Sequence, residues 1–223
     1  MIKAVILDFD DTLCLTQKAG FALENEALAK MGRSPMSLKI HKATWGQPLP
    51  EAIKLRSPGI DAEAFLKTFA PLMKQHFQEG RIDHVSEINL AALRQLASDN
   101  KTLLLVTSRS HEEAEHILHT DHVLSQHIEA FYYRGNMDYH KPDPRAFGHI
   151  ERNHGWKPEE CVYVGDSLSD AASAKGAGLH FIASLESGLR TRKDFAHYPV
   201  DEFVSSFPDI VAAVQKIEDK IEA

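Results

Sequence analysis

The stretch Ala4-Val-Ile-Leu-Asp-Phe-Asp-Asp-Thr12 sets an apolar run directly before a cluster of carboxylates in a chain of 223 residues. Such a run is typical of a strand that is buried on both faces, as in a parallel sheet. Three carboxylates, those of Asp8, Asp10 and Asp11, crowd at its end. They repel one another, and partial burial makes the repulsion more costly, so the sequence predicts a cation at this point.

Further strand-like runs alternate with helix-like segments along the chain. The strand-like runs are Leu103–Val106, Cys161–Val164, Phe181–Ala183 and, more weakly, Phe131–Tyr133. Apolar residues at helical spacing mark two helices, one striped by Leu90, Leu93 and Leu96, the other by Ile210, Val214, Ile217 and Ile221. This alternation predicts an α/β fold with a Rossmann-like, mostly parallel sheet.

The segment from about residue 16 to residue 85 breaks the alternation. It contains no convincing strand, only helical patches at Phe21–Met31 and Ala62–Glu79, with the turn-like stretches TWGQPLP and SPG between them. We therefore expect a helical cap domain over 16–85, inserted into a core domain made of 1–15 and 86–223.

Composition and charge narrow the class of protein. The net charge of −7 argues against nucleic acid or an anionic membrane surface as a partner, and it requires any phosphate site to be locally positive. The first apolar run is too short for a signal peptide, and no stretch reaches the length of a membrane span. Only two cysteines occur, Cys14 and Cys161, each beside apolar residues, so we expect reduced, buried thiols in a cytoplasmic protein.

Hydroxyl side chains follow the second predicted strand, in the stretch LLLVTSRS. Thr107 and Ser108 stand at the end of this strand. Ser110 and Glu113 fit a capping box, which satisfies the first free amides of the next helix. Ligands of an open α/β sheet bind beyond the carboxyl ends of its strands. We therefore expect Thr107 and Ser108 to be free to donate hydrogen bonds to a bound anion.

A lysine and two further carboxylates complete the set. Lys141 of HKPDP lies at a fixed junction, because Pro142 restrains its backbone just before a helix that we expect to begin at Asp143-Pro144. In VYVGDSLSD, Asp166 ends a strand and Asp170 faces the same way from the first turn of the next helix. Acids, hydroxyls and a lysine at separate strand ends are the groups that handle phosphate with a divalent metal.

Other motifs fail the requirements of their class. In HEEAEH, His111 and His116 lie five residues apart rather than four, so they do not share the helix face that a zinc site needs. We expect them, with His119 and His122, in a solvated helix and turn. AKGAGL lacks the third glycine of a dinucleotide loop and follows a helix, and no GxxxxGK[ST] phosphate loop occurs.

DFDDT, Thr107, Lys141 and GDSLSD, in that order, resemble the motifs of the haloacid dehalogenase superfamily of phosphohydrolases. The resemblance spans the chain, including the helical insertion, and is strongest to phosphoglycolate phosphatase-like and β-phosphoglucomutase-like members. Asp11 stands where many members have glycine, and Asp tolerates unusual backbone angles better than most residues. The resemblance implies a phosphatase that hydrolyses a small phosphorylated metabolite under a helical cap.

The resemblance also implies a role for each carboxylate. Asp8 is expected to attack phosphorus and form an aspartyl-phosphate. Asp10 is expected to protonate the leaving oxygen and then to deprotonate the hydrolytic water. Asp8, the carbonyl of Asp10 and Asp166 are expected to hold Mg²⁺, a hard ion suited to oxygen ligands. Asp170 is expected to orient a water of the metal.

Substrate contacts are expected from both domains. Thr107, the amide of Ser108 and Lys141 are expected to bind the phosphoryl oxygens. In the cap, the turn Gly46-Gln47 is expected to select the substrate, by resemblance to the matching turn of related members. Trp45 beside it fits core packing at least as well as a function.

Two alternatives stay open. A phosphomutase differs mainly in cap residues that return the phosphate to the substrate, although a sugar-contacting pattern is not obvious near Gln17–Gly20. A receiver-like signalling module shares the acids, the hydroxyl and the lysine around an aspartyl-phosphate. Receivers, however, are shorter, have no helical insert and place the phosphorylated Asp on a later strand. The identity of the substrate and the oligomeric state leave no signal in the sequence.

Overall fold

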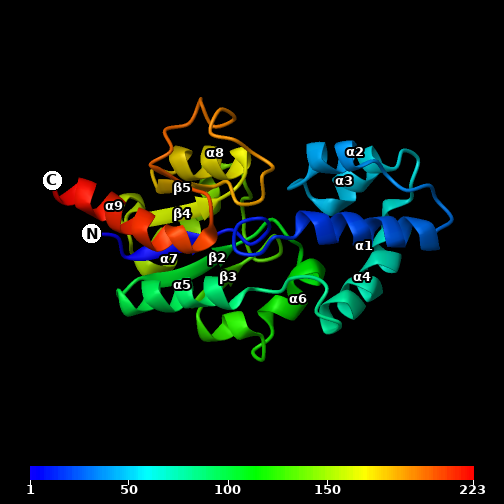
Figure 1. Ribbon diagram of the computed structural model, residues 1–223, viewed down its shortest axis with the longest axis horizontal. Helices are drawn as coiled ribbons and strands as arrows, with labels where there is room; N and C mark the ends of the chain where they lie inside the picture. Colours follow the sequence, from blue (N-terminus) through cyan, green and yellow to red (C-terminus); the bar gives the residue numbers. More distant parts are fainter.

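A computed structural model describes residues 1–223 and contains one six-stranded sheet with helices on both of its faces (Figure 1). The strands are β1 (Ala4–Leu7), β2 (Thr102–Val106), β3 (Ala130–Tyr132), β4 (Cys161–Gly165), β5 (His180–Ser184) and β6 (Glu202–Val204). The α-helices are α1 (Gln17–Lys30), α2 (Leu38–Thr44), α3 (Leu49–Arg56), α4 (Ala62–Gln78), α5 (Glu87–Ser98), α6 (His111–Leu118), α7 (Gly148–His154), α8 (Leu168–Gly176) and α9 (Ile210–Glu222). Four short 3₁₀ helices are η1 (Val123–Gln126), η2 (Pro144–Phe147), η3 (Pro158–Glu160) and η4 (Phe207–Asp209).

The strand order β3-β2-β1-β4-β5-β6 places β1 at the centre of the sheet, and every neighbouring pair is parallel. Leu7, the last residue of β1, is in register with Leu105 of β2 and Val164 of β4. The residues that follow these three strands therefore emerge at the same edge of the sheet. The predicted α/β fold with a parallel sheet is confirmed.

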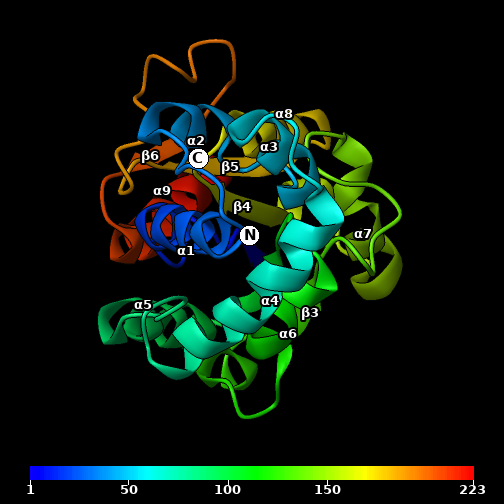
Figure 2. The ribbon, with the colours of Figure 1, turned by 90° about the vertical axis from the view of Figure 1, so that its right-hand side faces the viewer.

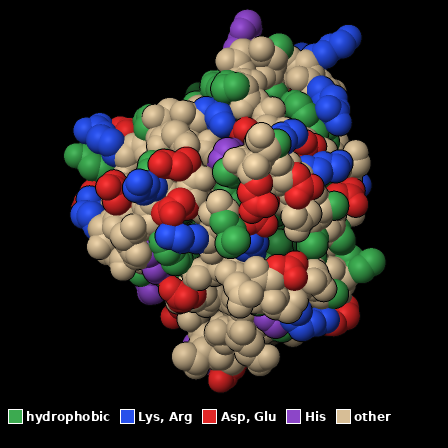
Figure 3. All heavy atoms as spheres, turned by 90° about the vertical axis from the view of Figure 1, so that its left-hand side faces the viewer, with side chains coloured by type: hydrophobic (Ala, Val, Ile, Leu, Met, Phe, Trp, Pro, Cys, Tyr) green, Lys and Arg blue, Asp and Glu red, His purple; other side chains and the backbone are tan.

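Successive residues of the strands pack on opposite faces, as the pleat of a strand requires. Val5 and Leu7 lie in a core shared with α5, α6 and α9. Ala4 and Ile6 lie in a second core shared with α7 and α8. On the side of the molecule where the chain termini lie, acidic and basic side chains are interspersed (Figure 3). No patch of a single sign dominates this side (Figure 3).

The helices α1–α4 form a unit with its own apolar core beside the carboxyl ends of the strands (Figures 1 and 2). Its buried residues include Leu23, Leu28, Ile53, Phe65, Phe69 and Leu72. The ion pair of Arg56 and Glu24 is buried with them. Arg56 donates two hydrogen bonds to the Glu24 carboxylate, at 2.6 and 2.7 Å. The chain enters this unit after β1 and leaves it before α5.

Local signals in the sequence account for several element ends. The capping box of Ser110 and Glu113 begins α6, as predicted. Asp143 caps η2, which runs on into α7, and α7 ends at Gly155 in the left-handed conformation. Both cysteines are free and buried, as expected. No helix has the length and apolar character that a membrane crossing requires.

Several elements differ from the sequence-based expectations. The strand expected at residues 131–133 lies one residue earlier, as β3. Helices α2 and α3 and strand β6 were not expected, because they have only seven, eight and three residues and so show little periodicity. The prediction of a solvated His116 is wrong. Its side chain is only 13% exposed and contacts the carboxylate of Asp83, which lies between α4 and α5.

Candidate active site

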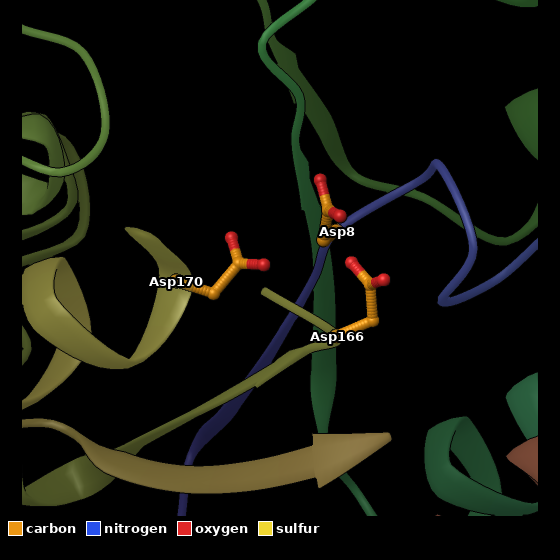
Figure 4. Close-up of side chains that lie close together, drawn as sticks. All are labelled: Asp8, Asp166 and Asp170. Atoms are coloured by element: carbon orange, nitrogen blue, oxygen red, sulfur yellow. The ribbon is translucent and has the colours of Figure 1, made fainter. Parts of the chain in front are cut away.

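Three carboxylates point toward one another at the carboxyl edge of the sheet (Figure 4). Asp8 directly follows β1, Asp166 directly follows β4, and Asp170 lies in the first turn of α8. One oxygen of each lies within 4.8 Å of an oxygen of the others, and all three residues are buried. The structure thus brings together three of the residues that the sequence suggested as metal ligands.

The loop between β4 and α8 fixes the position of Asp170. A Cβ atom at Gly165 would lie 2.6 Å from the Asp170 Cβ, so only glycine leaves room for this side chain. Ser167 caps α8: its Oγ accepts a hydrogen bond from the Asp170 amide at 3.2 Å and donates one to Asp170 Oδ2 at 2.6 Å. Asp170 is therefore held rigidly toward the other two carboxylates.

The three carboxylates are electrostatically unbalanced. Burial, reinforced by the charge of Asp170, raises the pKa of Asp8 to about 7, although Lys141 opposes the shift. Burial and the charges of Asp170 and Asp8 raise the pKa of Asp166 well above its usual range. A bound cation would relieve this repulsion, and hard oxygen donors are the ligands that Mg²⁺ prefers. The donor set therefore fits a magnesium ion.

Lys141 connects two of these carboxylates. Its Nζ donates to Asp8 Oδ1 at 2.8 Å, to Asp170 Oδ1 at 2.7 Å and to the Tyr163 hydroxyl at 2.9 Å. Burial alone would lower the pKa of Lys141, but Asp170 and Asp8 raise it above its ordinary value. Lys141 in turn holds the pKa of Asp170 below its ordinary value, although burial acts in the opposite direction.

Three of the four predicted substrate contacts, Ser108, Lys141 and Gln47, line two cavities, and Thr107 lines neither. The smaller, of about 50 Å³, is lined by Asp8, Lys141 and Asp166, and the larger, of about 100 Å³, is lined by Gln47. Ser108 lines both cavities. Thr107 is buried, and its Oγ1 accepts a hydrogen bond from the amide of Arg109 at 3.3 Å. Residues of the sheet domain and of the α1–α4 unit therefore line both cavities.

The carboxylate of Asp10 lies apart from the three grouped carboxylates and lines both cavities. Its Oδ1 accepts hydrogen bonds from the Thr16 hydroxyl at 2.6 Å and from Arg109 Nη2 at 2.7 Å. Its Oδ2 accepts one from Arg109 Nε at 2.9 Å. The two aspartates of DFD therefore have separate environments, as separate chemical roles require. The metal contact expected of Asp10 is through its carbonyl and does not require this carboxylate.

Asp11 connects the sheet domain to the α1–α4 unit. Its φ is +56°, in the left-handed region that Asp tolerates better than most residues. Asp11 Oδ2 accepts a hydrogen bond from Trp45 Nε1 at 2.5 Å. Burial, reinforced by the charge of Asp10, raises the pKa of Asp11 to about 6. A Cβ at Gly20 would lie 2.8 Å from the Trp45 ring, so the absence of a side chain at Gly20 lets the indole pack closely beside the site.

Two residues of the site were not among the predicted ones. Arg109, which holds Asp10, had a signal, because a cation directly follows the Thr107-Ser108 pair in the sequence. Tyr163, whose hydroxyl contacts Lys141 and Asp170, had none. It stands within an apolar strand, where a tyrosine is ordinarily a packing residue.

Known proteins are similar to this chain in sequence. The family model described as haloacid dehalogenase-like hydrolase matches residues 5–184. A phosphoglycolate phosphatase from Nitrosospira multiformis is 24% identical over 221 residues, covering 96% of each chain. A phosphoglycolate phosphatase from Cereibacter sphaeroides is 28% identical over 217 residues, covering 94% of this chain and 98% of the relative.

Solved structures agree in fold. A haloacid dehalogenase-like hydrolase from Bacteroides fragilis superposes with a TM-score of 0.80 at 22% identity, covering 94% of this chain and all of that one. The predicted enzyme class, a phosphatase, is confirmed, and neither the phosphomutase nor the receiver module is favoured. With a family model matched over residues 5–184, this chain belongs to the haloacid dehalogenase-like hydrolase family.

Proposed function

We propose that this phosphatase is Mg²⁺-dependent and hydrolyses a small phosphorylated metabolite through an aspartyl-phosphate at Asp8. One observation carries the proposal. Asp8 accepts a hydrogen bond from the ammonium of Lys141, at 2.8 Å, and its carboxylate groups with those of Asp166 and Asp170. One oxygen of Asp8 thus lies beside the ammonium of Lys141, which can bind a phosphoryl group. The Asp8 carboxylate also belongs to the group of three carboxylates that can bind a metal.

In the first step an oxygen of Asp8 attacks phosphorus. The bond from phosphorus to the ester oxygen breaks, and that oxygen takes a proton from the Asp10 carboxyl group to leave as an alcohol. In the second step a water attacks the same phosphorus and gives one proton to Asp10. The Asp8–phosphorus bond breaks, which regenerates the Asp8 carboxylate and releases inorganic phosphate.

Asp8, Asp166 and the Asp10 carbonyl would hold Mg²⁺, with Asp170 beside them. When bound, the ion supplies positive charge that offsets the negative charge of the phosphoryl group and of the carboxylates. Lys141 adds a second positive group, and Ser108 and Thr107 supply donors for the remaining phosphoryl oxygens. Tyr163 and Asp170 hold Lys141 in place through hydrogen bonds of 2.9 and 2.7 Å.

In this proposal, residues 16–85 act as a cap and exclude water from the reacting groups. The turn Gly46-Gln47 faces the larger cavity, together with Asp10 and Ser108, and contacts the part of the substrate that leaves. The relatives from Nitrosospira multiformis and Cereibacter sphaeroides are named as phosphoglycolate phosphatases. Phosphoglycolate is therefore the first substrate to test.

The test is release of inorganic phosphate from phosphoglycolate, sugar phosphates, nucleotides and an aryl phosphate, each with Mg²⁺ and with excess chelator. We expect Mg²⁺-dependent release from at least one small ester. Rapid acid quenching during turnover should also trap a phosphate on the peptide that contains Asp8, labile to hydroxylamine as an acyl phosphate is. Full activity in chelator would contradict the metal site, and a label on another residue would contradict the assignment of Asp8.

A further inference from the structure

All the hydrogen bonds that the Arg109 guanidinium donates go to other groups of the protein. Nε and Nη2 donate to the two oxygens of Asp10, at 2.9 and 2.7 Å. Nη1 and Nη2 donate to the two oxygens of Asp83, at 2.6 and 2.8 Å. Nη1 also donates to the carbonyl oxygen of Glu113 at 3.3 Å. A guanidinium has five N–H donors, so none is left for a substrate.

The two carboxylates come from the two points where the chain crosses between the sheet domain and the cap. Asp10 lies between β1 and α1, on the way into the cap. Asp83 lies between α4 and α5, on the way back. Arg109 itself follows β2 and belongs to the sheet domain. One guanidinium group therefore joins a loop of the core to both crossings.

Asp83 is held in a single place by its own surroundings. Its side chain is 1% exposed, and its backbone adopts φ of +55°, a conformation that L residues rarely adopt. His116 of α6 contacts Asp83 Oδ2 through Nε2 at 2.5 Å, and the His116 ring packs against Phe77 of α4 at 4.4 Å between centroids. Strained, fully bonded residues of this kind are typical of functional sites.

The geometry favours a positional role for Arg109. Its side chain is 10% exposed, and its guanidinium lies over the ring of Phe9 at 4.6 Å. A planar guanidinium bonded to both oxygens of a carboxylate fixes the plane of that carboxylate as well as its distance. Asp83 fixes the guanidinium in the same way from the other side. Besides the hydrogen bond from the Thr16 hydroxyl at 2.6 Å, the orientation of Asp10 therefore depends on a residue of the second crossing.

We propose that Arg109 is a positioning residue, which Asp83 orients and which aims the Asp10 carboxyl group at the oxygen that leaves from phosphorus. The proposal rests on the acid–base role of Asp10 proposed above. Asp83, in the second crossing (residues 79–86), thus affects the proton transfer, although none of the sequence motifs includes this crossing.

The experiment measures kcat/KM for a series of phosphate esters whose leaving groups range from nitrophenols to simple alcohols. This parameter reports the steps up to the transfer of phosphate to Asp8, where a proton from Asp10 helps alcohols but is hardly needed by nitrophenols. Asp83→Asn keeps an oxygen acceptor and a residue that tolerates positive φ. We expect it, and Arg109→Lys, to lower kcat/KM for alkyl esters about tenfold more than for the nitrophenyl ester.

Glu218→Gln is the matched control, because Glu218 also forms a buried ion pair, with Lys101 at 2.7 Å, near the opposite edge of the sheet. It should lower thermal stability and leave the dependence on the leaving group unchanged. Asp10→Asn removes the acid altogether, and kcat/KM of this variant should depend most steeply on the leaving group.

The outcomes separate the two proposals. If Asp10→Asn leaves the dependence on the leaving group unchanged, the acid role of Asp10 is wrong and this inference falls with it. If Asp10→Asn steepens the dependence on the leaving group while Asp83→Asn and Arg109→Lys lower kcat/KM equally for all esters, the acid role of Asp10 stands. The positioning role of Arg109 is then overturned. A uniform rise in KM for the Arg109 variant would likewise overturn it in favour of substrate binding.

Discussion

The two aspartates of the DFD motif each face a buried cation, and the two centres differ in what surrounds that cation. Lys141 bridges Asp8 and Asp170, and Arg109 bridges Asp10 and Asp83. In both, a cation connects a carboxylate of the motif to a second, more deeply buried acid. Burying a charge is costly unless it is paired, so this arrangement makes possible the burial of Asp8 and the partial burial of Asp10.

The Lys141 centre carries more negative charge than the Arg109 centre, with three carboxylates rather than two around one cation. Asp166 adds a third carboxylate beside Asp8 and Asp170, so one lysine cannot balance the group. Around Arg109, the second acid, Asp83, has a further partner in His116. Although burial acts in the opposite direction, Arg109 and His116 hold the pKa of Asp83 well below its usual range. The first centre is therefore suited to bind a metal and a phosphoryl group, and the second to hold a side chain still.

The largest expected effect comes from removing the nucleophile of the first centre. Asp8→Asn keeps the shape of the side chain and leaves Lys141 bonded to Asp170 and Tyr163. Because the amide cannot form the acyl phosphate, we expect turnover to fall on the order of 10⁴-fold or more. Steady-state phosphate release measures this, with circular dichroism as the control for folding. Turnover within about tenfold of the unmodified protein would contradict the assignment.

A second prediction sets the two cations against each other. Lys141→Gln and Arg109→Gln each leave two buried carboxylates without their cation, so each should lower the free energy of unfolding by about 3 kcal/mol without metal. Mg²⁺ should narrow the difference from the unmodified protein in Lys141→Gln, because the ion binds beside Asp8 and Asp170, and should leave it unchanged in Arg109→Gln, which keeps all the metal ligands. Denaturant unfolding with and without Mg²⁺ measures the difference. Equal recovery in both variants would mean that the centres are not chemically distinct.

The third prediction concerns the pH dependence of the metal-free protein. Burial raises the pKa of Asp8 to about 7, so between its ordinary value and about 7 the folded chain keeps a proton that the unfolded chain releases. Stability without metal should therefore fall as pH rises through this window. Since Mg²⁺ binds the ionised carboxylates, it should stabilise the protein more at about pH 8 than at about pH 5, by on the order of 1 kcal/mol. A stabilisation independent of pH would contradict the assigned ligands.

The same contrast explains what the sequence predicts well. Asp8, Thr107, Lys141 and Asp166 lie at strand ends or helix starts of one parallel sheet, and each is flanked by an apolar run or a proline that marks the element. A parallel sheet gathers its carboxyl ends at one edge, so short motifs far apart in the chain predict one site. The α/β fold follows from the same runs.

The second centre could not be predicted in this way. Asp83 lies in the irregular crossing 79–86, where no periodicity marks its direction, and its contact with Arg109 depends on how the cap packs on the core. His116 has the sequence context of an exposed helix, and only the packing of α6 against Phe77 buries it. Short helices such as α2 and α3 were missed for the same reason, because they are stabilised by tertiary contacts such as Arg56 with Glu24.

The smallest expected effect lies in the cap turn, away from both centres. Gln47 lines the larger cavity beside Asp10 and Ser108, and its neighbour Gly46 adopts φ of +84° in the turn between α2 and α3. A side chain here reaches the leaving part of the substrate rather than the phosphoryl group. Gln47→Ala should therefore change the ratio of kcat/KM between two natural esters by about three- to tenfold and change hydrolysis of a minimal aryl phosphate less.

Gln78→Ala is the matched control, because Gln78 is an exposed glutamine on α4 of the same cap and does not line this cavity. It should leave all ratios unchanged. If Gln47→Ala lowers kcat/KM for every substrate by the same factor, the turn acts on closure of the cap as a whole. If it changes none, substrate selection lies elsewhere in the lining. A selective change would complete the contrast, since the core centres contact only groups that every phosphate ester shares, while the cap contacts the part in which esters differ.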